Sequence, residues 1–226
     1  MRLIGIAVLG CWLVAMSLCA FNMNSELIKV GDIEFLQKPP DCVKKAMEYN
    51  YANKLKDNGL LRFRNIEYYR VIEGERSDKY EGIGLNKLNG HTMTSGTVNQ
   101  VFVWCCSLKE ANSSELLKLD ENYNAILTIT NPLEFIKRIS ESIAKMYSIL
   151  IQCGEITYDR MKSVTKEELN DKVFQHNIFQ KGETDLYQNE YRISLTNIDW
   201  NNKIENDFID VLIGDCSDIV TINNCV

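Results

Sequence analysis

A run of six apolar residues at positions 101–106, Val-Phe-Val-Trp-Cys-Cys, constrains the fold of this chain more than any other segment. A nearly continuous apolar run of this length is typical of a strand that is covered on both faces. Such a strand has other strands along its edges and packed layers above and below it. The sequence therefore predicts a sheet with residues 101–106 near its centre.

Strand-like and helix-like segments alternate on both sides of this run. Asn131 followed by Pro132 predicts a capped helix with proline in its first turn, and Asn65 predicts the start of a short helix. The order favours one α+β domain with a mixed, mainly antiparallel sheet and flanking helices. Strands are predicted at residues 27–36, 60–63, 125–129, 151–158, 191–198, 208–213 and 219–222. Helices are predicted at 42–56, 132–150 and, from a capping box, 165–168, with a long glycine-rich loop at 74–96.

Length and charge limit the class of protein. The chain has 226 residues, and no linker divides residues 23–226, so one domain with a sizeable core is expected there. The net charge is −6, and lysine and arginine form no basic stripe. Because nucleic acid is bound through clustered positive charge, an extended nucleic-acid surface is excluded.

The first 22 residues differ in composition from the rest. Residues 3–21 carry no charge and follow Arg2, which fits the apolar region of a signal peptide and is also long enough for an uncleaved membrane anchor. Met16 and Met23 allow a third interpretation, in which the start is over-long and translation begins internally. With a real leader the protein is exported or tethered to a membrane through residues 3–21. Without one it is cytoplasmic.

Six cysteines follow this segment, and no two of them have Cys-x-x-Cys spacing, so neither a zinc site nor a redox pair is indicated. Buried thiols are predicted for Cys105, Cys106 and Cys153, which lie in strand-like runs. Cys216 and Cys225 are predicted to be exposed and able to pair in an exported protein.

Polar residues at two distant places in the chain suggest a binding site. Arg62 and Arg64 lie in an early strand-like run. Gln188, Glu190 and Arg192 occupy alternate positions near a late strand, so they would share one of its faces. Arginines matched with a late glutamate suit a phosphate-bearing sugar substrate. The alternative is an exposed polar strand face, with a Glu190–Arg192 attraction worth under about 1 kcal/mol.

The order of these residues resembles the three-part pattern of the ADP-ribosyltransferase fold: an arginine-bearing strand, a central strand that ends in Ser107, and Gln188-x-Glu190 at the opening of a late strand. The chain also resembles, over about residues 27–195, a broad group of bacterial proteins without an established activity. Their shared outline is a Gly-Leu-Leu-Arg-Phe-like strand, a Tyr-Tyr-Arg…Glu…Arg-x-Asp…Glu-Gly stretch, an apolar strand ending in Cys-x-Ser or Cys-Ser, and a closing Gln-x-Glu-aromatic-Arg.

The resemblance to ADP-ribosyltransferases implies NAD as the substrate and a role for each matched position. Glu190 would bond the nicotinamide ribose and stabilise the positive charge that develops as nicotinamide leaves, while Gln188 would orient the acceptor. Arg62 or Arg64 would bind the dinucleotide phosphates, and Ser107 would hold Glu190 by a hydrogen bond. The acceptor of ADP-ribose would be a protein or a nucleotide, as in a toxin or defence enzyme. The implied site consists of catalytic Glu190 and Gln188 and of substrate-binding Arg62, Arg64, Tyr69, Ser107 and Arg192.

Acidic residues between positions 73 and 81 offer a competing interpretation as a divalent-metal site. Basic residues are interleaved with these acids, so a loop of ion pairs within the segment is favoured and no metal is predicted. The acids are Glu73, Glu75, Asp78 and Glu81, and the bases are Arg70, Arg76 and Lys79. His91 and His176 have no partner at a metal-ligand spacing.

A second function of a different class stays open from the sequence. In it the chain is a non-catalytic envelope or interaction protein, and the polar strand residues form surface ion pairs. Convergence of Glu190, Gln188 and an early arginine on one cleft would favour the enzyme, because catalytic groups must meet the same substrate.

Overall fold

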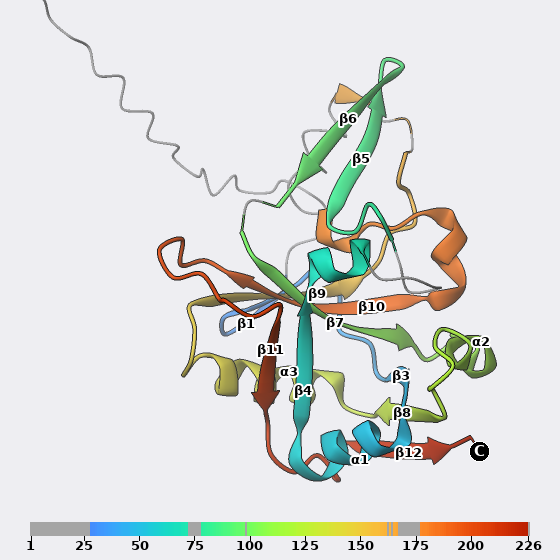
Figure 1. Cartoon of the computed structure of the whole chain (residues 1–226), viewed down its shortest axis with the longest axis vertical. Coiled ribbons are helices and arrows are strands. Elements are labelled where there is room, and N and C mark those ends of the chain that lie inside the picture. Colours follow the sequence, from blue (N-terminus) through green and yellow to red (C-terminus); the bar gives the residue numbers. More distant parts are fainter. Residues whose placement is uncertain are drawn as a thin grey trace, which may run out of the picture.

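Strand β7 (Val101–Leu108) runs through the middle of the main sheet in the computed structural model (Figure 1). One edge of β7 pairs antiparallel with β10 (Glu190–Asn197), with Glu190 opposite Ser107. The other edge is divided between two strands, because β3 (Val43–Met47) pairs with the end of β7 and β4 (Leu60–Asn65) with its start. The predicted central position of residues 101–106 is confirmed.

The structure describes residues 28–71, 78–97, 99–161, 163, 165–166 and 177–225. The predicted leader lies outside the described residues, as does most of the predicted capping-box helix. Outside them too are Glu73, Glu75, Arg76 and His176. Within the described part of the chain, no helix has the length and apolar character needed to cross a bilayer.

Among the described residues, ten strands form the main sheet, and most neighbours are antiparallel. Its long path runs in the order β1 (Ile28–Val30), β2 (Ile33–Phe35), β9 (Ile149–Glu155), β10, β7, β3, β8 (Ala125–Ile129) and β12 (Val220–Asn224), while β11 (Phe208–Leu212) pairs with β4. The pair β2–β9 is parallel. This sheet confirms the predicted α+β domain with a mixed, mainly antiparallel sheet.

Helical segments and a second small sheet complete the domain (Figure 1). In the part of the chain that the structure describes, the helices are α1 (Tyr49–Asn58), α2 (Ser113–Leu117) and α3 (Pro132–Ile143), and the 3₁₀ segments are η1 (Ile66–Arg70), η2 (Asn177–Phe179) and η3 (Glu183–Gln188). Strands β5 (Ile83–Leu88) and β6 (His91–Gly96) form a hairpin that projects from the body of the domain (Figure 1).

The two faces of β7 have different surroundings because side chains alternate along a strand. Trp104 and Cys106 point into the main hydrophobic core. Helix α3 covers this face, and the ring of its Phe135 lies 5.6 Å from the Trp104 ring, measured between centroids. Cys105 and Ser107 belong to the opposite face, which carries the polar residues described below.

Both predicted asparagine caps are present. At the start of α3 the side chain of Asn131 accepts a hydrogen bond from the Glu134 N–H at 3.2 Å, and at η1 Asn65 accepts from the Glu67 N–H at 3.0 Å. Helix α3 ends at Ile143, earlier than the predicted boundary near residue 150, because residues 149–155 form strand β9.

Three predictions of local structure are wrong, and tertiary pairing is the reason. The predicted helix 42–56 begins as strand β3, because pairing with β7 and β8 buries Val43 and Ala46. The predicted strand 27–36 is a hairpin that turns at Gly31, whose φ is +61°. The predicted loop 74–96 contains the β5–β6 hairpin, which turns at Gly90 with a φ of +81°.

The cysteine predictions hold with two exceptions, since Cys105 is half-buried instead of buried and Cys216 is not at the surface. Cys106 and Cys153 are buried, and Cys225 is exposed. Cys216 was expected at the surface but is fully buried, because its N–H donates to the Lys56 carbonyl at 2.8 Å and so packs it against the end of α1. The six cysteines of the described residues are free thiols.

Candidate functional site

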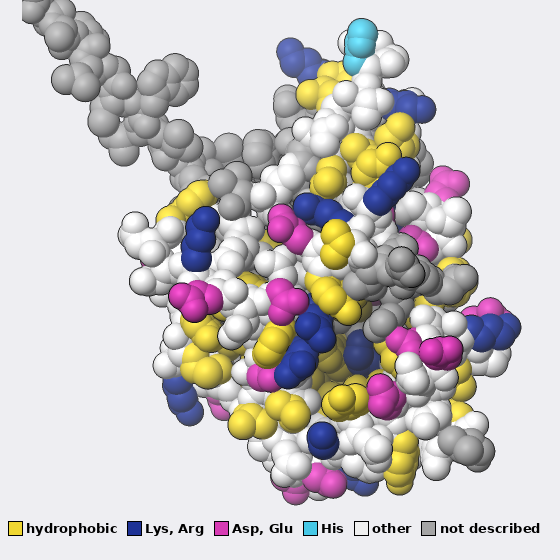
Figure 2. All heavy atoms as spheres, in the orientation of Figure 1, with side chains coloured by type: hydrophobic (Ala, Val, Ile, Leu, Met, Phe, Trp, Pro, Cys, Tyr) yellow, Lys and Arg dark blue, Asp and Glu magenta, His cyan; other side chains and the backbone are white. Residues whose placement is uncertain are grey.

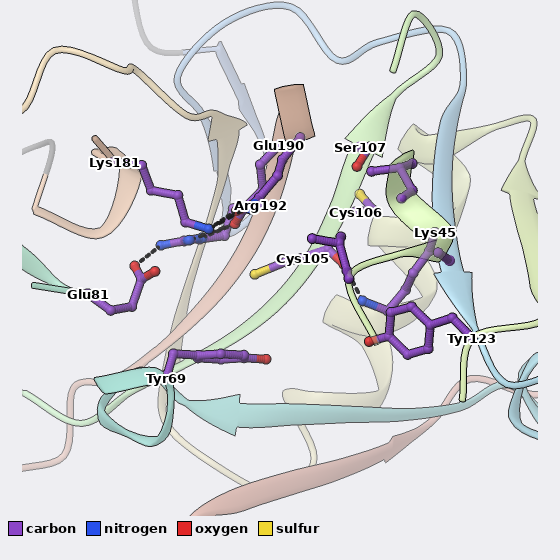
Figure 3. A pocket seen from close by; sticks show the side chains of 14 residues that line it. Lys45, Tyr69, Glu81, Cys105, Cys106, Ser107, Tyr123, Lys181, Glu190 and Arg192 are labelled. Carbon is purple, nitrogen blue, oxygen red and sulfur yellow. Dashed lines mark hydrogen bonds and ion pairs between the residues drawn. The ribbon is translucent and has the colours of Figure 1, made fainter. Parts of the chain in front are cut away.

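A pocket opens on the face of the sheet opposite α3 (Figure 3). Its volume is about 100 Å³. Figure 2 shows a hollow on this side of the molecule with basic side-chain atoms inside it. Strands β3, β7 and β10, segment η1 and helix α2 supply most of the wall, which consists of Lys45, Ala46, Tyr69, Glu81, Cys105, Cys106, Ser107, Leu116, Leu119, Tyr123, Lys181, Gln188, Glu190 and Arg192.

Strand alternation places Glu190 and Arg192 on the pocket side of β10, opposite Ser107 and Cys105 of β7. The Arg192 guanidinium donates from Nε and Nη2 to Glu190 Oε1, at 2.8 and 2.6 Å. Its Nη1 donates to Glu81 Oε1 at 2.7 Å and also to the Ile178 carbonyl. One arginine therefore joins two carboxylates.

Lys181 extends this cluster on its other side. Its Nζ lies 2.7 Å from Glu190 Oε2 and donates to Gln188 Oε1 at 3.0 Å. Two cations and two anions thus form one chain of contacts, in the order Lys181, Glu190, Arg192, Glu81 (Figure 3). We call these four residues the charge cluster. Arg192 is only 1% exposed and Glu190 only 4%. Charges so deeply buried are tolerated because each one is paired.

Within the cluster, Glu190 and Lys181 shift each other's pKa toward the charged form. Burial alone would raise the pKa of Glu190, but the charges of Arg192 and Lys181 hold it well below its ordinary value. Burial alone would lower the pKa of Lys181, yet Glu190 and Glu81 raise it above its ordinary value. Both residues therefore keep their charge, because each stabilises the ionised form of the other.

Two other groups in the pocket wall are neutral at pH 7. Burial raises the pKa of the Cys105 thiol to about 12, and burial also raises the pKa of Tyr69 well above its ordinary value. A thiol nucleophile reacts as the thiolate, so Cys105 is unsuited to nucleophilic attack here. Both groups can still form hydrogen bonds with a ligand.

The structure brings five of the predicted site residues together and leaves two outside. Around the pocket lie Gln188, Glu190, Arg192, Tyr69 and Ser107. The carboxylate of Glu190 is held by Arg192 and Lys181, while Ser107 lies beside it as its cross-strand neighbour.

Arg62 and Arg64 do not line the pocket. Arg62 donates from Nε and Nη2 to the two carboxylate oxygens of Asp210, each at 2.7 Å. Arg64 lies 3.7 Å from Asp207 and 4.7 Å from the centre of the Tyr68 ring. Both arginines are therefore engaged with residues at the β4–β11 edge of the sheet.

Gln188 lines the pocket, but it precedes strand β10, so alternation along that strand does not determine its direction. It ends η3, and Asn189, with φ 40° and ψ 53°, turns the chain before β10 begins at Glu190. The expectation that Gln188, Glu190 and Arg192 share one strand face is thus correct for the last two and wrong for Gln188. The alternative of an exposed polar face is also wrong, because all three residues are buried.

Sequence reasoning missed Lys45 and Lys181 and misassigned Glu81. The expected loop of local ion pairs is incorrect at its described positions, since Glu81 pairs with Arg192 and Asp78 pairs with Arg160 at 2.7 Å. The spacing of residues in the sequence does not identify Arg192 or Arg160 as the partner, because each ion pair joins segments far apart in the chain. Across the described ranges, no group of three or more His, Cys, Asp or Glu side chains is placed to hold a metal ion.

Comparisons with known proteins found no match to this chain among protein-family models, curated proteins or solved structures. The fold and the pocket therefore define the class only as an α+β domain with a buried charge cluster at a small pocket.

Proposed function

We propose that the pocket is the substrate site of an ADP-ribosyltransferase-like enzyme that acts on NAD. The supporting observation is that Glu190, Gln188 and Arg192 meet Tyr69 and Ser107 in one pocket, although these residues come from three separate parts of the chain. Titratable groups that are strongly perturbed and line a cavity are candidates for function.

The size of the pocket limits what enters it. A cavity of about 150 Å³ holds a benzene ring, and this pocket measures about 100 Å³. Only one group of a dinucleotide would therefore lie inside, and the remainder would lie across its mouth. In this proposal the nicotinamide ribose enters in part, with Glu190 and Gln188 as hydrogen-bond partners of the hydroxyls that lie inside.

The charge cluster adds a condition to this mechanism. Glu190 accepts from Arg192 on one oxygen and contacts Lys181 through the other, so two cations cancel most of its field. Positive charge at the ribose would be stabilised by Glu190 only after Lys181 turned from the carboxylate toward the substrate. Lys181→Met should therefore change the rate of nicotinamide release more than the affinity for NAD.

Release of nicotinamide from NAD by the purified protein tests the proposal. Glu190→Gln keeps the size of the side chain and removes its charge, and we expect release to fall at least about 100-fold. Glu155→Gln is the matched control, because Glu155 lies on the neighbouring strand β9 and outside the pocket wall. Equal release by the Glu190→Gln variant and the wild type would refute a catalytic Glu190.

One observation favours a non-catalytic binding or interaction protein as the second candidate. The four charges of the cluster satisfy one another without any ligand. This candidate predicts no nicotinamide release from the wild type under any condition, together with a thermal shift on adding the partner.

The remaining expectations concern location and acceptor. The proposed acceptor is a protein or a nucleotide, in keeping with a toxin or defence role. A mass spectrum of the natural N-terminus tests the leader: a terminus near Asn22 indicates cleavage and export, and one at Met1 indicates an uncleaved anchor. A terminus at Met23 indicates internal initiation in the cytoplasm.

A further inference from the structure

Lys45 occupies the place where the edge of β7 changes partners. Strand β3 pairs with β7 at Ser107 and Leu108, and β4 pairs with it at Phe102 and Val103. Cys105 lies between these two stretches, so neither strand completes its hydrogen bonding on that edge. The Nζ of Lys45 donates to the Cys105 carbonyl instead and lies 4.8 Å from the centre of the Trp104 ring. The ammonium group therefore fills the split in the sheet at the wall of the pocket.

The charges around the pocket do not balance. Lys45, Lys181 and Arg192 supply three cations, and Glu81 and Glu190 supply two anions. The last four are paired with one another in the charge cluster. Lys45 is the one lining cation outside the charge cluster, so among the described lining residues the excess positive charge belongs to it. Figure 3 shows Lys45 across the pocket from Lys181, with Cys105 between them.

The ammonium group of Lys45 has three N–H donors, and one of them is directed at the Cys105 carbonyl. A ligand in the pocket would meet this ammonium at the pocket wall, where the Tyr123 hydroxyl also lies (Figure 3). The phenol of Tyr69 and the hydroxyl of Ser107, which also line the pocket, can donate to the same ligand. A positive charge and hydroxyl donors around one pocket match an anion with several acceptor oxygens.

We propose that Lys45 binds the phosphate group of a phosphorylated sugar, whose hydroxyls face Gln188 and Glu190. The proposal deepens the proposed function by naming the phosphate-binding residue. It concerns only the charge of the ligand and so does not require that NAD be turned over. It also replaces Arg62 and Arg64, which are paired elsewhere, in the phosphate-binding role.

Calorimetric titration with ribose 5-phosphate and with methyl ribofuranoside tests the proposal, because both probes present a furanose ring and only the first carries a phosphate. We expect the wild type to bind ribose 5-phosphate at least about tenfold more tightly, a difference of about 1.4 kcal/mol. Lys45→Gln can still donate to the Cys105 carbonyl but carries no charge, and it should lose the preference. Lys45→Arg should keep it.

Lys44 provides a matched control on the same strand. Its Nζ also donates to a backbone carbonyl, that of Ala111 at 3.2 Å, but it does not line the pocket. Lys44→Gln should therefore keep the preference for the phosphorylated probe. Equal binding of the two probes by the wild type would overturn the proposal, as would a preference that survives in Lys45→Gln.

Folding of each variant is checked by circular dichroism. If Lys45→Gln does not fold, the affinity of the wild type for ribose 5-phosphate is measured at increasing salt concentration instead. Added salt screens the attraction between an ammonium and a phosphate, so the affinity should fall. Affinity for ribose 5-phosphate that is independent of salt would then overturn the proposal. Phosphate-dependent binding without nicotinamide release would refute only the NAD-consuming function, and release that is insensitive to Lys45→Gln would refute only the role of Lys45.

Discussion

Glu81 and Arg192 are 111 positions apart in the chain, and their side chains meet at 2.7 Å with both groups almost completely buried. The same glutamate is fixed through its backbone, because its carbonyl accepts a hydrogen bond from Arg70 Nε at 2.6 Å. The segment that follows η1 is thus tied both to η1 and to strand β10. One wall of the pocket is therefore held by a long-range ion pair together with a hydrogen bond to the backbone.

Replacement of Arg192 tests how far the fold depends on this cluster. Arg192→Met would leave Glu81 and Glu190 buried without their shared cation, and loss of one partner of a buried pair costs about 3–5 kcal/mol. We expect a loss of that size in the free energy of unfolding, measured with urea at pH 7. Arg62→Met breaks a more exposed pair and should cost under about 1 kcal/mol. Similar losses in the two variants would contradict the assigned role of the cluster.

Acid should destabilise the protein partly through Glu190. Its pKa is lowered by Arg192 and Lys181 against the opposing effect of burial, whereas an unfolded glutamate has a pKa of about 4.3. The stability that comes from this shift is complete above the unfolded pKa and is lost as the pH falls toward the folded one. The free energy of unfolding should therefore fall more steeply below about pH 4 in the wild type than in Glu190→Gln. Parallel curves would rule out this contribution.

Alanine substitutions at Gly59 and Gly90 distinguish the cost of backbone strain from the cost of side-chain crowding. Both have positive φ, +65° and +81°. A Cβ at Gly59 would lie 2.6 Å from Ile213 Cγ1 and 2.7 Å from the Gly214 nitrogen, while a Cβ at Gly90 would meet nothing within 4 Å. Gly90→Ala should cost about 1 kcal/mol from strain alone, and Gly59→Ala about 2–4 kcal/mol because overpacking is added. Equal midpoints in urea unfolding would contradict the crowding at Gly59.

Arg62 and Arg64 should be dispensable for ligand binding. Because they are paired with Asp210 and Asp207 outside the pocket, the double variant Arg62→Ala, Arg64→Ala should bind ribose 5-phosphate as the wild type does. Calorimetric titration of the double variant measures this directly. A large loss of affinity in a folded double variant would return these arginines to the site.

Features that depend on nearby residues could be predicted from the sequence. The run 101–106 identifies the central strand because burial on both faces requires apolar residues at every position. The caps at Asn65 and Asn131 could be predicted because each one bonds a neighbour two or three residues away. The adjacency of Glu190 and Arg192 follows from alternation along one strand.

Features that depend on distant partners could not be predicted in the same way. Strand β3 has a helix-compatible sequence, and pairing with β7 and β8 decides its structure. Glu81 has basic neighbours in the sequence, and the nearest one along the chain suggested a local ion pair. Its partner in space is instead set by how η1 and β10 pack, which no spacing in the sequence encodes.

The left-handed turn at Asn189 places the Gln188 amide and the Glu190 carboxylate of the pocket on two different structural elements. Gln188 is carried by a 3₁₀ segment and Glu190 by the central sheet, although they are two residues apart. Lengthening or reshaping the turn would move the amide and leave the carboxylate anchored. An engineer who wished to change what this pocket accepts could therefore vary one chemical group while holding the other fixed.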